Sequence, residues 1–398
     1  MTRPTVEVAD IFRSQANRFI DRHRHWLRFR QLKIMHAITR CRTAALGGHI
    51  DRCGQYTCRN GCGNAEDTIS FNSCRDRHCP KCQAQARQRW IAARQQELLA
   101  TSYFHVVFTL PHDLHALIRQ NTVELYNLLF RAVAETLMEV AANPEHLGAE
   151  IGFFAILHTW GQNLLFHPHI HCVVPAGGLA PDRARWVHRS GTFFLPIDVL
   201  KPVFRGKFID GLKDAFLLKR LNMEGQIRHL ATPKSFAAFL RKLHRHEWVA
   251  YAKPSFGGPE QVLRYLGRYT HRVAISNHRL ISFDGESVTF RWRDYAHGNK
   301  KRRMTVSADE FIRRFLMHVL PKGFVRIRHF GFMANYQRTA SLDLCRKLLA
   351  MPPVDRSTTM GPPGRLCPHC GAAMIVVERL TAAQIRWRFV PTCVMDTS

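Results

Sequence analysis

Residues 166–174 read FHPHIHCVV, and this stretch decides the kind of domain that the chain contains. On a β-strand successive side chains point to opposite faces, so His169 and His171 project to the same side. Two neighbouring imidazoles on a rigid strand can chelate one divalent cation, and burying them without partners would be costly. We therefore predict that His169 and His171 bind a metal ion. His167 is expected before the strand, since Pro168 favours a strand that begins after it.

The segments around this strand alternate between two hydrophobic patterns. Short runs rich in β-branched and aromatic residues indicate strands, and longer runs with apolar residues three or four apart indicate helices. The alternation is typical of an α/β or α+β domain with one central sheet, and we predict the α+β class. The expected strands are 103–110, 151–160, 169–174 and 186–195; the expected helices are 1–40, 84–99, 121–142, 198–221 and 307–320, with a hairpin over 279–292.

A second informative stretch is the helix expected from Gly258 to about Thr270, where Pro259 occupies a favourable first position. Tyr265 and Tyr269 are four residues apart, so both phenols lie on one face of that helix. Tyrosines at this spacing are most often packing residues, and the pair alone favours that interpretation. Positive charge suited to phosphate groups surrounds the pair, from Arg264, Arg268, Arg272 and His271.

Seven of the twelve cysteines fall between Cys41 and Cys82. We see no secretory signal, so this clustering favours metal binding in a reducing compartment over disulfides. Cys79 and Cys82 form a knuckle with two intervening residues, which lets both thiolates face one zinc ion. The pairing of the other cysteines stays open, and Cys74, His49 and His78 leave room for a second ion. The expected zinc ligands are Cys53, Cys58, Cys62, Cys74, Cys79 and Cys82.

The remaining cysteines divide into two groups. Cys367-Pro-His-Cys370 is another knuckle sequence and a possible second zinc site, with Cys393 as one further ligand. Cys41, Cys172 and Cys345 show no such pattern and are interpreted as packed small side chains.

The chain of 398 residues carries 58 Lys and Arg against 30 Asp and Glu, a formal net charge of +28. A protein this basic is expected to bind polyanions, most commonly nucleic acid. The cluster Lys300, Lys301, Arg302 and Arg303, with aromatic residues such as Trp292 nearby, combines phosphate binding with base stacking. We found no apolar run long enough to span a bilayer and expect no membrane partner.

Three motifs together resemble the transposases of the insertion sequence 91 type, which are rolling-circle enzymes of the larger His-hydrophobic-His endonuclease superfamily. They are SCRDRHCPKCQ at 73–83, HPHIH at 167–171 followed by Gly177-Gly178, and YLGRYTHRVAISNHRL at 265–280. The resemblance spans roughly residues 10–345, and the motifs occur in family order. One departure is the first knuckle, where Cys53-x4-Cys58-x3-Cys62 replaces the expected close pair.

The resemblance implies a mechanism. His169 and His171 would hold Mg²⁺ or Mn²⁺ against the scissile phosphate of single-stranded DNA. Tyr265 and Tyr269 would be the nucleophiles, with a 5′-phosphotyrosine intermediate. Gln261 and His271 are candidates for a third metal ligand. Zinc would be structural and would help to recognise the ends of the element.

The expected domains follow chain order. A helical arm and zinc-binding domain covers 1–95, a catalytic domain 96–300, a basic extension of that domain 301–350, and a linker with a possible small zinc knuckle 351–398. The catalytic domain is expected to have a central antiparallel sheet with flanking helices. The expected location is the bacterial cytoplasm, at the nucleoid when DNA is bound.

Three alternatives remain from the sequence. A plasmid replication initiator or relaxase would use the same metal and tyrosine chemistry. A zinc-dependent DNA-binding protein, or an inactive transposase remnant, would lack catalysis. A transposase with three acids and two metals would leave the paired histidines unexplained.

Overall fold

The structure is a computed structural model that describes residues 4–54, 68–188, 195–254, 260, 267, 274–294, 297–352, 366–367 and 370–389. The chain forms two compact units. Unit 1 comprises 1–89, 271–319 and 355–398, and unit 2 comprises 90–270 and 320–354. Each unit therefore combines segments that are distant in the sequence, whereas the expected domains followed chain order. No helix in the described ranges has the length and apolar character to cross a membrane.

The helical part of unit 1 confirms the helices expected over residues 1–40. Helices α1 (Val8–His23) and α2 (Phe29–Arg40) each bury one apolar stripe, and the ring of Phe12 meets Phe315 of α9 edge-on at 5.3 Å. Burial of these apolar faces accounts for the packing of the two helices.

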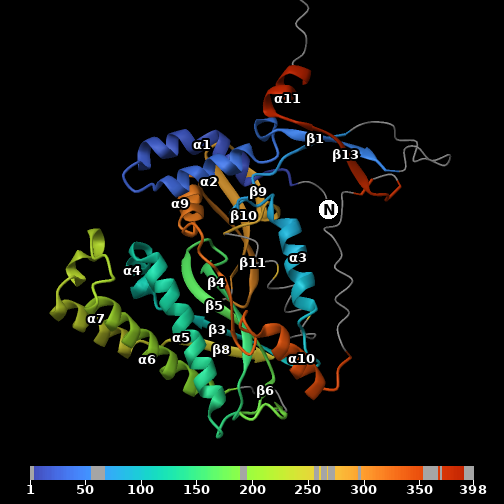
Figure 1. The fold of residues 1–398 in the computed structure, drawn as a ribbon. Helices are drawn as coiled ribbons and strands as arrows, with labels where there is room; N and C mark the ends of the chain where they lie inside the picture. The colour runs from blue at the N-terminus through green and yellow to red at the C-terminus, as the bar shows by residue number, and fades with distance from the viewer. Residues whose placement is uncertain are drawn as a thin grey trace, which may run out of the picture. The chain divides into compact units, whose positions relative to one another are not determined.

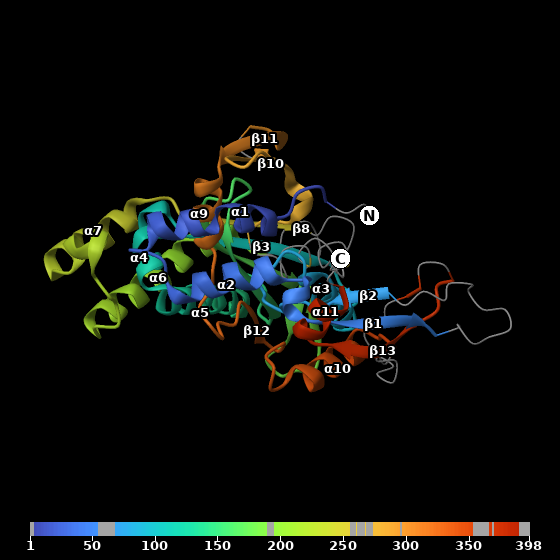
Figure 2. The same ribbon diagram turned by 90° about the horizontal axis from the view of Figure 1, so that it is seen from above.

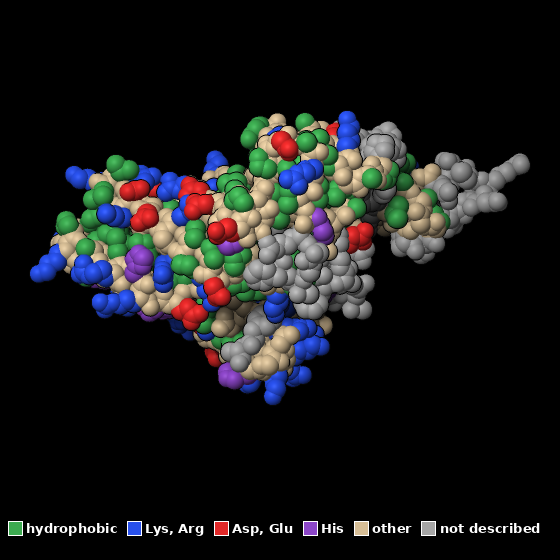
Figure 3. Space-filling model, turned by 90° about the horizontal axis from the view of Figure 1, so that it is seen from below, with side chains coloured by type: hydrophobic (Ala, Val, Ile, Leu, Met, Phe, Trp, Pro, Cys, Tyr) green, Lys and Arg blue, Asp and Glu red, His purple; other side chains and the backbone are tan. Residues whose placement is uncertain are grey.

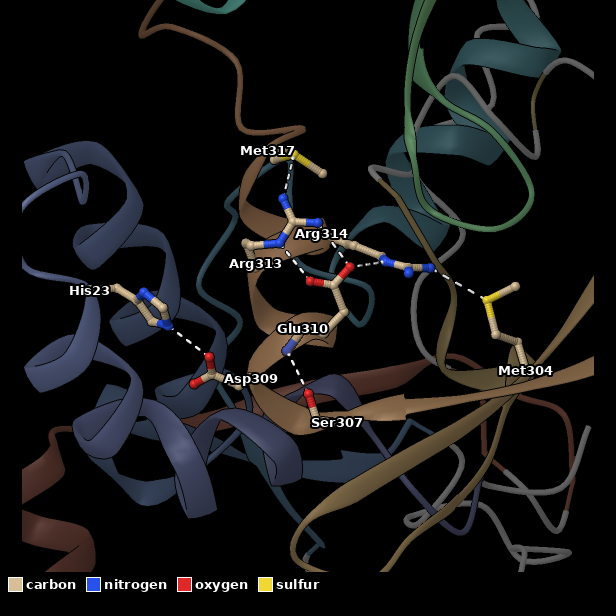
Figure 4. A network of polar contacts seen from close by, with 8 residues as sticks. All are labelled: His23, Met304, Ser307, Asp309, Glu310, Arg313, Arg314 and Met317. Carbon is tan, nitrogen blue, oxygen red and sulfur yellow. Dashed lines mark hydrogen bonds and ion pairs between the residues drawn. The ribbon is translucent and has the colours of Figure 1, made fainter. Parts of the chain in front are cut away.

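Helix α9 (Ala308–Leu316), within the helix expected over 307–320, begins with a side-chain cap. The Ser307 hydroxyl accepts a hydrogen bond from the backbone N–H of Glu310 at 3.2 Å. The Glu310 carboxylate in turn accepts hydrogen bonds from the guanidinium groups of Arg313 and Arg314 (Figure 4). The hydrogen bond from Arg313 is the main reason that the pKa of Glu310 falls to about 2. Nε2 of His23 lies 2.7 Å from a carboxylate oxygen of Asp309, and this contact connects α9 to α1.

Unit 1 also contains two antiparallel sheets of three strands. The first has the order β13-β1-β2, and Figure 2 shows its strands side by side. The second, in the order β11-β10-β9, contains the predicted hairpin and adds β11, which the sequence analysis had treated only as a basic cluster. The elements are β1 (Gly48–Cys53), β2 (Thr68–Phe71), β13 (Met374–Leu380), β9 (Leu280–Phe283), β10 (Ser287–Asp294), β11 (Lys300–Ser307) and helix α11 (Ala382–Phe389).

Unit 2 is built on an antiparallel sheet of five strands in the order β12-β4-β5-β3-β8, which confirms the predicted antiparallel sheet. Strand β5 begins at Phe166, so His167 lies on the strand and not before it. Pro168 is tolerated there because the pairing of β5 with β4 is irregular between His158 and Trp160, and a proline, which has no N–H, is accepted at such an irregularity. The Pro168 carbonyl accepts the Leu110 N–H at 3.2 Å. The strands are β12 (Ile327–Gly331), β4 (Gly152–Trp160), β5 (Phe166–Pro175), β3 (Tyr103–Thr109) and β8 (Val249–Pro254), with a separate pair β6 (Gly177–Leu179) and β7 (Trp186–His188).

Helices cover one face of this sheet, as Figure 1 shows for α5 and α6. The Phe108 ring of β3 packs against Phe204 of α6 at 4.9 Å, and the guanidinium of Arg328 lies over the Phe130 ring of α5 at 4.2 Å. The opposite face carries the histidines of β5. The helices are α4 (His115–Gln120), α5 (Thr122–Ala142), α6 (Ile197–Leu217), α7 (Pro233–Arg245) and α10 (Arg338–Leu348), and α3 (Gln83–Gln95) crosses the boundary between the units in sequence.

Candidate metal centres and basic ribbon

Strand register brings three histidines together in unit 2. His169 lies directly opposite His158 of β4, and His171 follows two residues later on the same face of β5. One ring nitrogen from each of the three lies within 4.8 Å of the others. The predicted pair is thus joined by a third imidazole that the sequence analysis did not identify. Its only signal in the sequence is a histidine in the apolar strand 152–160, where a packed histidine is the usual interpretation.

Two of these three imidazole rings are oriented by a polar contact through their other ring nitrogen. Nδ1 of His169 lies 2.6 Å from the His167 carbonyl, which fixes that nitrogen as the donor and leaves Nε2 for a metal. Nδ1 of His171 lies 2.7 Å from Nε2 of His105, and the two rings stack at 4.9 Å. His105 therefore supports the centre from β3 without being one of its three grouped ligands.

The protonation state of the centre suits metal binding. Burial lowers the pKa of His169 to about 3 and that of His105 to about 4, and it lowers the pKa values of His158 and His171 well below the usual range. The rings are therefore neutral at pH 7, which is the form of imidazole that binds metals. Three nitrogen donors fit Mn²⁺ better than Mg²⁺, because Mg²⁺ prefers oxygen ligands.

The same face of the sheet becomes apolar away from the histidines. Tyr103, Phe154 and Val173 lie on this face by register and belong to one buried cluster with residues of α10. Trp90 of α3 packs edge-on against Phe154 at 5.7 Å. One part of this sheet face thus belongs to the hydrophobic core, and the part that carries the histidines is where a metal ion can be bound.

Four cysteines form a separate centre in unit 1. The Sγ atoms of Cys41, Cys74, Cys79 and Cys82 all lie within 4.8 Å of one another. The Sγ of Cys82 lies 3.1 Å from that of Cys41 and 3.4 Å from that of Cys74. Sulfurs around a tetrahedral zinc with bonds of about 2.3 Å would be roughly 3.8 Å apart, so four sulfurs in this arrangement fit zinc.

The ligand set differs in part from the one expected. Cys41, interpreted from the sequence as a packing residue, follows the last turn of α2 and completes the group. Hydrogen bonds among the four thiols lower the pKa of Cys41 to about 7 and lower that of Cys82, whereas they raise the pKa values of Cys74 and Cys79. Zinc binding at this group would therefore release protons from Cys74 and Cys79. Cys53 lies instead with Cys367 and Cys370 in another group.

Other histidines of the cysteine-rich region do not enter either cysteine group. The buried His78 contacts Asp76 through Nδ1 at 2.7 Å, and Asp76 also lies 3.7 Å from Arg30 of α2. Nε2 of His49 lies 3.4 Å from the Asp51 carboxylate. The contacts of Asp76 hold the loop before α3, and the contact of His49 lies within strand β1. Among the described residues, neither imidazole belongs to a cysteine group.

The predicted basic cluster lies on a two-stranded ribbon, β10–β11. Register pairs Arg291 with Arg303 and Arg293 with Lys301, and all four side chains are exposed on one face. Lys300 and Arg302 belong to the other face, where Arg302 binds the Asp294 carboxylate at 3.1 Å. Like charges directly opposite each other destabilise a ribbon, so the first face is suited to an anionic partner. Figure 3 shows Lys and Arg side chains around this projecting ribbon.

Several predicted residues lie outside the part of the chain that the structure describes, so their roles stay predictions. They are Tyr265, Tyr269, Gln261, Arg264, Arg268, His271 and Arg272 of the tyrosine segment, and Cys58, Cys62 and Cys393.

Comparison with known proteins identifies the families and relatives that this chain resembles. Residues 11–110 match a family described as a transposase zinc-binding domain, and residues 152–340 match a family described as a putative transposase. A putative transposase of Sinorhizobium fredii, y4qJ, is 51% identical over 392 residues, which cover 95% of this chain and 96% of the relative. The transposase for insertion sequence element IS801 of Pseudomonas savastanoi pv. phaseolicola is 29% identical over 301 residues, which cover 74% of this chain and 68% of that protein. No solved structure matches the chain.

Proposed function

The chain belongs to the transposases of the insertion sequence 91 type, and from this premise we propose that it cleaves and rejoins single-stranded DNA through a 5′-phosphotyrosine intermediate. The observation that carries the proposal is the convergence of His158, His169 and His171 on one face of the central sheet. Three neutral imidazoles at this spacing can hold a metal ion, and rolling-circle strand transfer is the chemistry that the resemblance associates with such a site.

In this proposal the three histidines hold Mn²⁺ or Mg²⁺, and the donor set favours Mn²⁺. Bound to these histidines, such a cation would supply Lewis-acid polarisation of the scissile phosphate. His105 and the His167 carbonyl keep the rings of His171 and His169 in their binding orientation.

The nucleophiles of the proposed reaction are Tyr265 and Tyr269. The phenol oxygen of one tyrosine attacks the phosphorus and gives up its proton, the bond from phosphorus to the 3′ oxygen breaks, and that oxygen leaves as a 3′-hydroxyl after taking a proton. The new phosphotyrosine bond retains the energy of the phosphodiester, so no nucleotide cofactor is needed. A second tyrosine lets the enzyme hold one DNA end while it attacks another.

DNA binding is assigned to the basic surfaces. The exposed face of the β10–β11 ribbon presents four cations without an intervening acid, and we infer that it contacts DNA phosphates. The arginines around the tyrosines, Arg264, Arg268 and Arg272, would hold the strand at the nucleophiles. The zinc-binding domain, with Cys41, Cys74, Cys79 and Cys82 as the proposed zinc ligands, would help to recognise the ends of the element.

The test is covalent capture of DNA. The purified chain is incubated with Mn²⁺ and end-labelled single-stranded DNA carrying the element's ends, and the products are separated on a denaturing gel. We expect a labelled protein band that the double variant Tyr265→Phe and Tyr269→Phe loses while it still binds DNA. Tyr336→Phe, a change at an exposed tyrosine outside this segment, is the matched control and should retain the band.

The alternative without catalysis makes the opposite prediction. A zinc-dependent DNA-binding protein, or an inactive remnant, would bind the DNA and give no labelled band in any variant. A band that persists in the double tyrosine variant would assign the nucleophile elsewhere.

A further inference from the structure

We propose that Cys53, Cys367 and Cys370 hold a second, structural zinc ion, which joins the end of strand β1 to a knuckle more than 300 residues later in the chain. Their ligand atoms lie within 4.8 Å of one another, and the Sγ atoms of Cys53 and Cys370 are 3.4 Å apart across a sequence separation of 317 residues. Cys53 lies within the match to the zinc-binding family, but both family matches end before Cys367, so neither covers the knuckle with which Cys53 is grouped.

The backbone around Cys367 and Cys370 forms the tight turn that a zinc knuckle requires. The Gly371 N–H donates to the Cys367 carbonyl at 2.9 Å, and the Cys367 N–H donates to the Ala372 carbonyl at 2.7 Å. Gly371 has φ of +74°, a conformation that glycine adopts without strain. This turn directs both thiols of the knuckle to the same side.

Strand pairing brings the knuckle to Cys53. Strand β13 begins with Met374, four residues after Cys370, and Met374 is the register partner of Cys53, the last residue of β1. The Gly54 N–H donates to the Ala373 carbonyl at 3.0 Å, which continues the contact to the knuckle itself. A sheet of three short strands contributes little stability by itself, and pairing strands so distant in the sequence costs chain entropy. A metal ion bound at this end would therefore stabilise the pairing of β1 with β13.

The chemistry of the group indicates zinc. Three thiolates are soft ligands, and zinc takes four ligands in a tetrahedron, so one further ligand completes the site. Cys53 and Cys367 are almost fully buried and Cys370 is exposed, so the group sits at the surface with its sulfurs partly shielded. The four sulfurs of the Cys41 centre form a complete set of their own, so the two groups do not compete for a ligand.

The first experiment replaces zinc with Co²⁺ in the full chain and measures the thiolate-to-cobalt absorption, which histidine sites do not contribute. Wild type should show the intensity of both cysteine groups. The Cys370→Ser variant, changed at an exposed position, should lose about three sevenths of it if the whole second group releases the metal. Cys345→Ala removes a buried cysteine outside both groups and should lose none.

Two further variants distinguish loss of the second metal site from misfolding of the chain. Cys41→Ser should leave the absorption of the second group in place. Cys370→His keeps a zinc ligand at the knuckle and should restore metal binding with one thiolate fewer. Unchanged absorption in Cys370→Ser, or loss of all absorption in Cys41→Ser, would overturn the proposal.

A disulfide between Cys53 and Cys370 is the competing explanation for their proximity. Alkylation of the denatured chain without reductant, followed by mass spectrometry, distinguishes the two. Denaturation releases a structural metal, so we expect both cysteines to be alkylated without reductant. An alkylation-resistant pair that needs reductant would overturn the zinc assignment.

Discussion

The histidine centre of unit 2 and the four-cysteine centre of unit 1 are assembled in different ways. His158 and His169 meet because two neighbouring strands pair in one register, and a shift of one residue would turn His158 to the other face. Cys74, Cys79 and Cys82 lie within nine residues of chain, and only Cys41 comes from farther away. We therefore expect the first centre to be held by the hydrogen bonds and core of its sheet, and the second to need a bound metal for its shape.

This difference predicts the largest effect for Cys79→Ser. Structural zinc contributes roughly 10 kcal/mol or more to the folding of small zinc peptides, so loss of one buried ligand should release the zinc and unfold the loop between β2 and α3. The zinc content of the purified variant would measure the loss of metal, and limited proteolysis of the segment that follows Cys74 would measure the unfolding. Cys345→Ala is the control. A variant that keeps its zinc would show that these four sulfurs do not form the centre.

The second prediction concerns His158→Ala. Changes to residues that merely support a metal ligand cost about 10–100-fold, so removal of a proposed ligand should lower Mn²⁺-dependent DNA cleavage by about 100-fold or more. The fold and the zinc content should not change, because the sheet does not need the metal. Thermal unfolding and the denaturing-gel assay would measure both, and His244→Ala, at an exposed histidine of α7, is the control. Full activity would remove His158 from the site.

A third prediction separates DNA binding from both centres. Replacing Arg293 and Lys301 by Gln should remove two phosphate contacts and reduce the slope of log affinity against log salt concentration by about 1.4–1.8. Arg302→Gln, whose charge is already bound by Asp294, should change the slope less. A change of slope in Arg302→Gln as large as half that of the double variant would contradict the two-faced ribbon that the strand register shows.

The smallest expected effect tests the sheet alone. Burial lowers the pKa of His329 on β12 to about 3, so the unfolded chain binds a proton there between about pH 6.5 and 3 that the folded chain does not. The contribution of His329 to the free energy of unfolding should thus be complete above pH 6.5. As the pH is lowered from 6.5 to 3, the free energy of unfolding should decrease by up to about 1.4 kcal/mol per pH unit from this group. His329→Gln should unfold with a shallower pH dependence in metal-free buffer, and an unchanged dependence would contradict the pKa shift.

Local patterns predicted much of this fold because they are local. The helices over 1–40, 121–142 and 198–221 and the strands over 103–110 and 151–160 follow from spacing and residue type, and the structure confirms them within a few residues. The ribbon strand β11 was missed because four consecutive cations hide its alternation, which only the paired strand β10 reveals. Strand β13 was missed because its exposed apolar run lies after a Pro- and Gly-rich segment.

The sequence by itself determined the chemistry available: paired histidines on one strand, clustered cysteines, a basic surface, and the motifs that identify the family. Tertiary structure decided which of these side chains meet. His158 joins His169 through strand register, Cys41 joins Cys74 through the end of α2, and Cys53 joins Cys370 through β1 and β13. The reason is that side-chain spacing along a helix or strand is set by neighbouring residues, whereas contacts between distant segments are set by the packing of the whole chain.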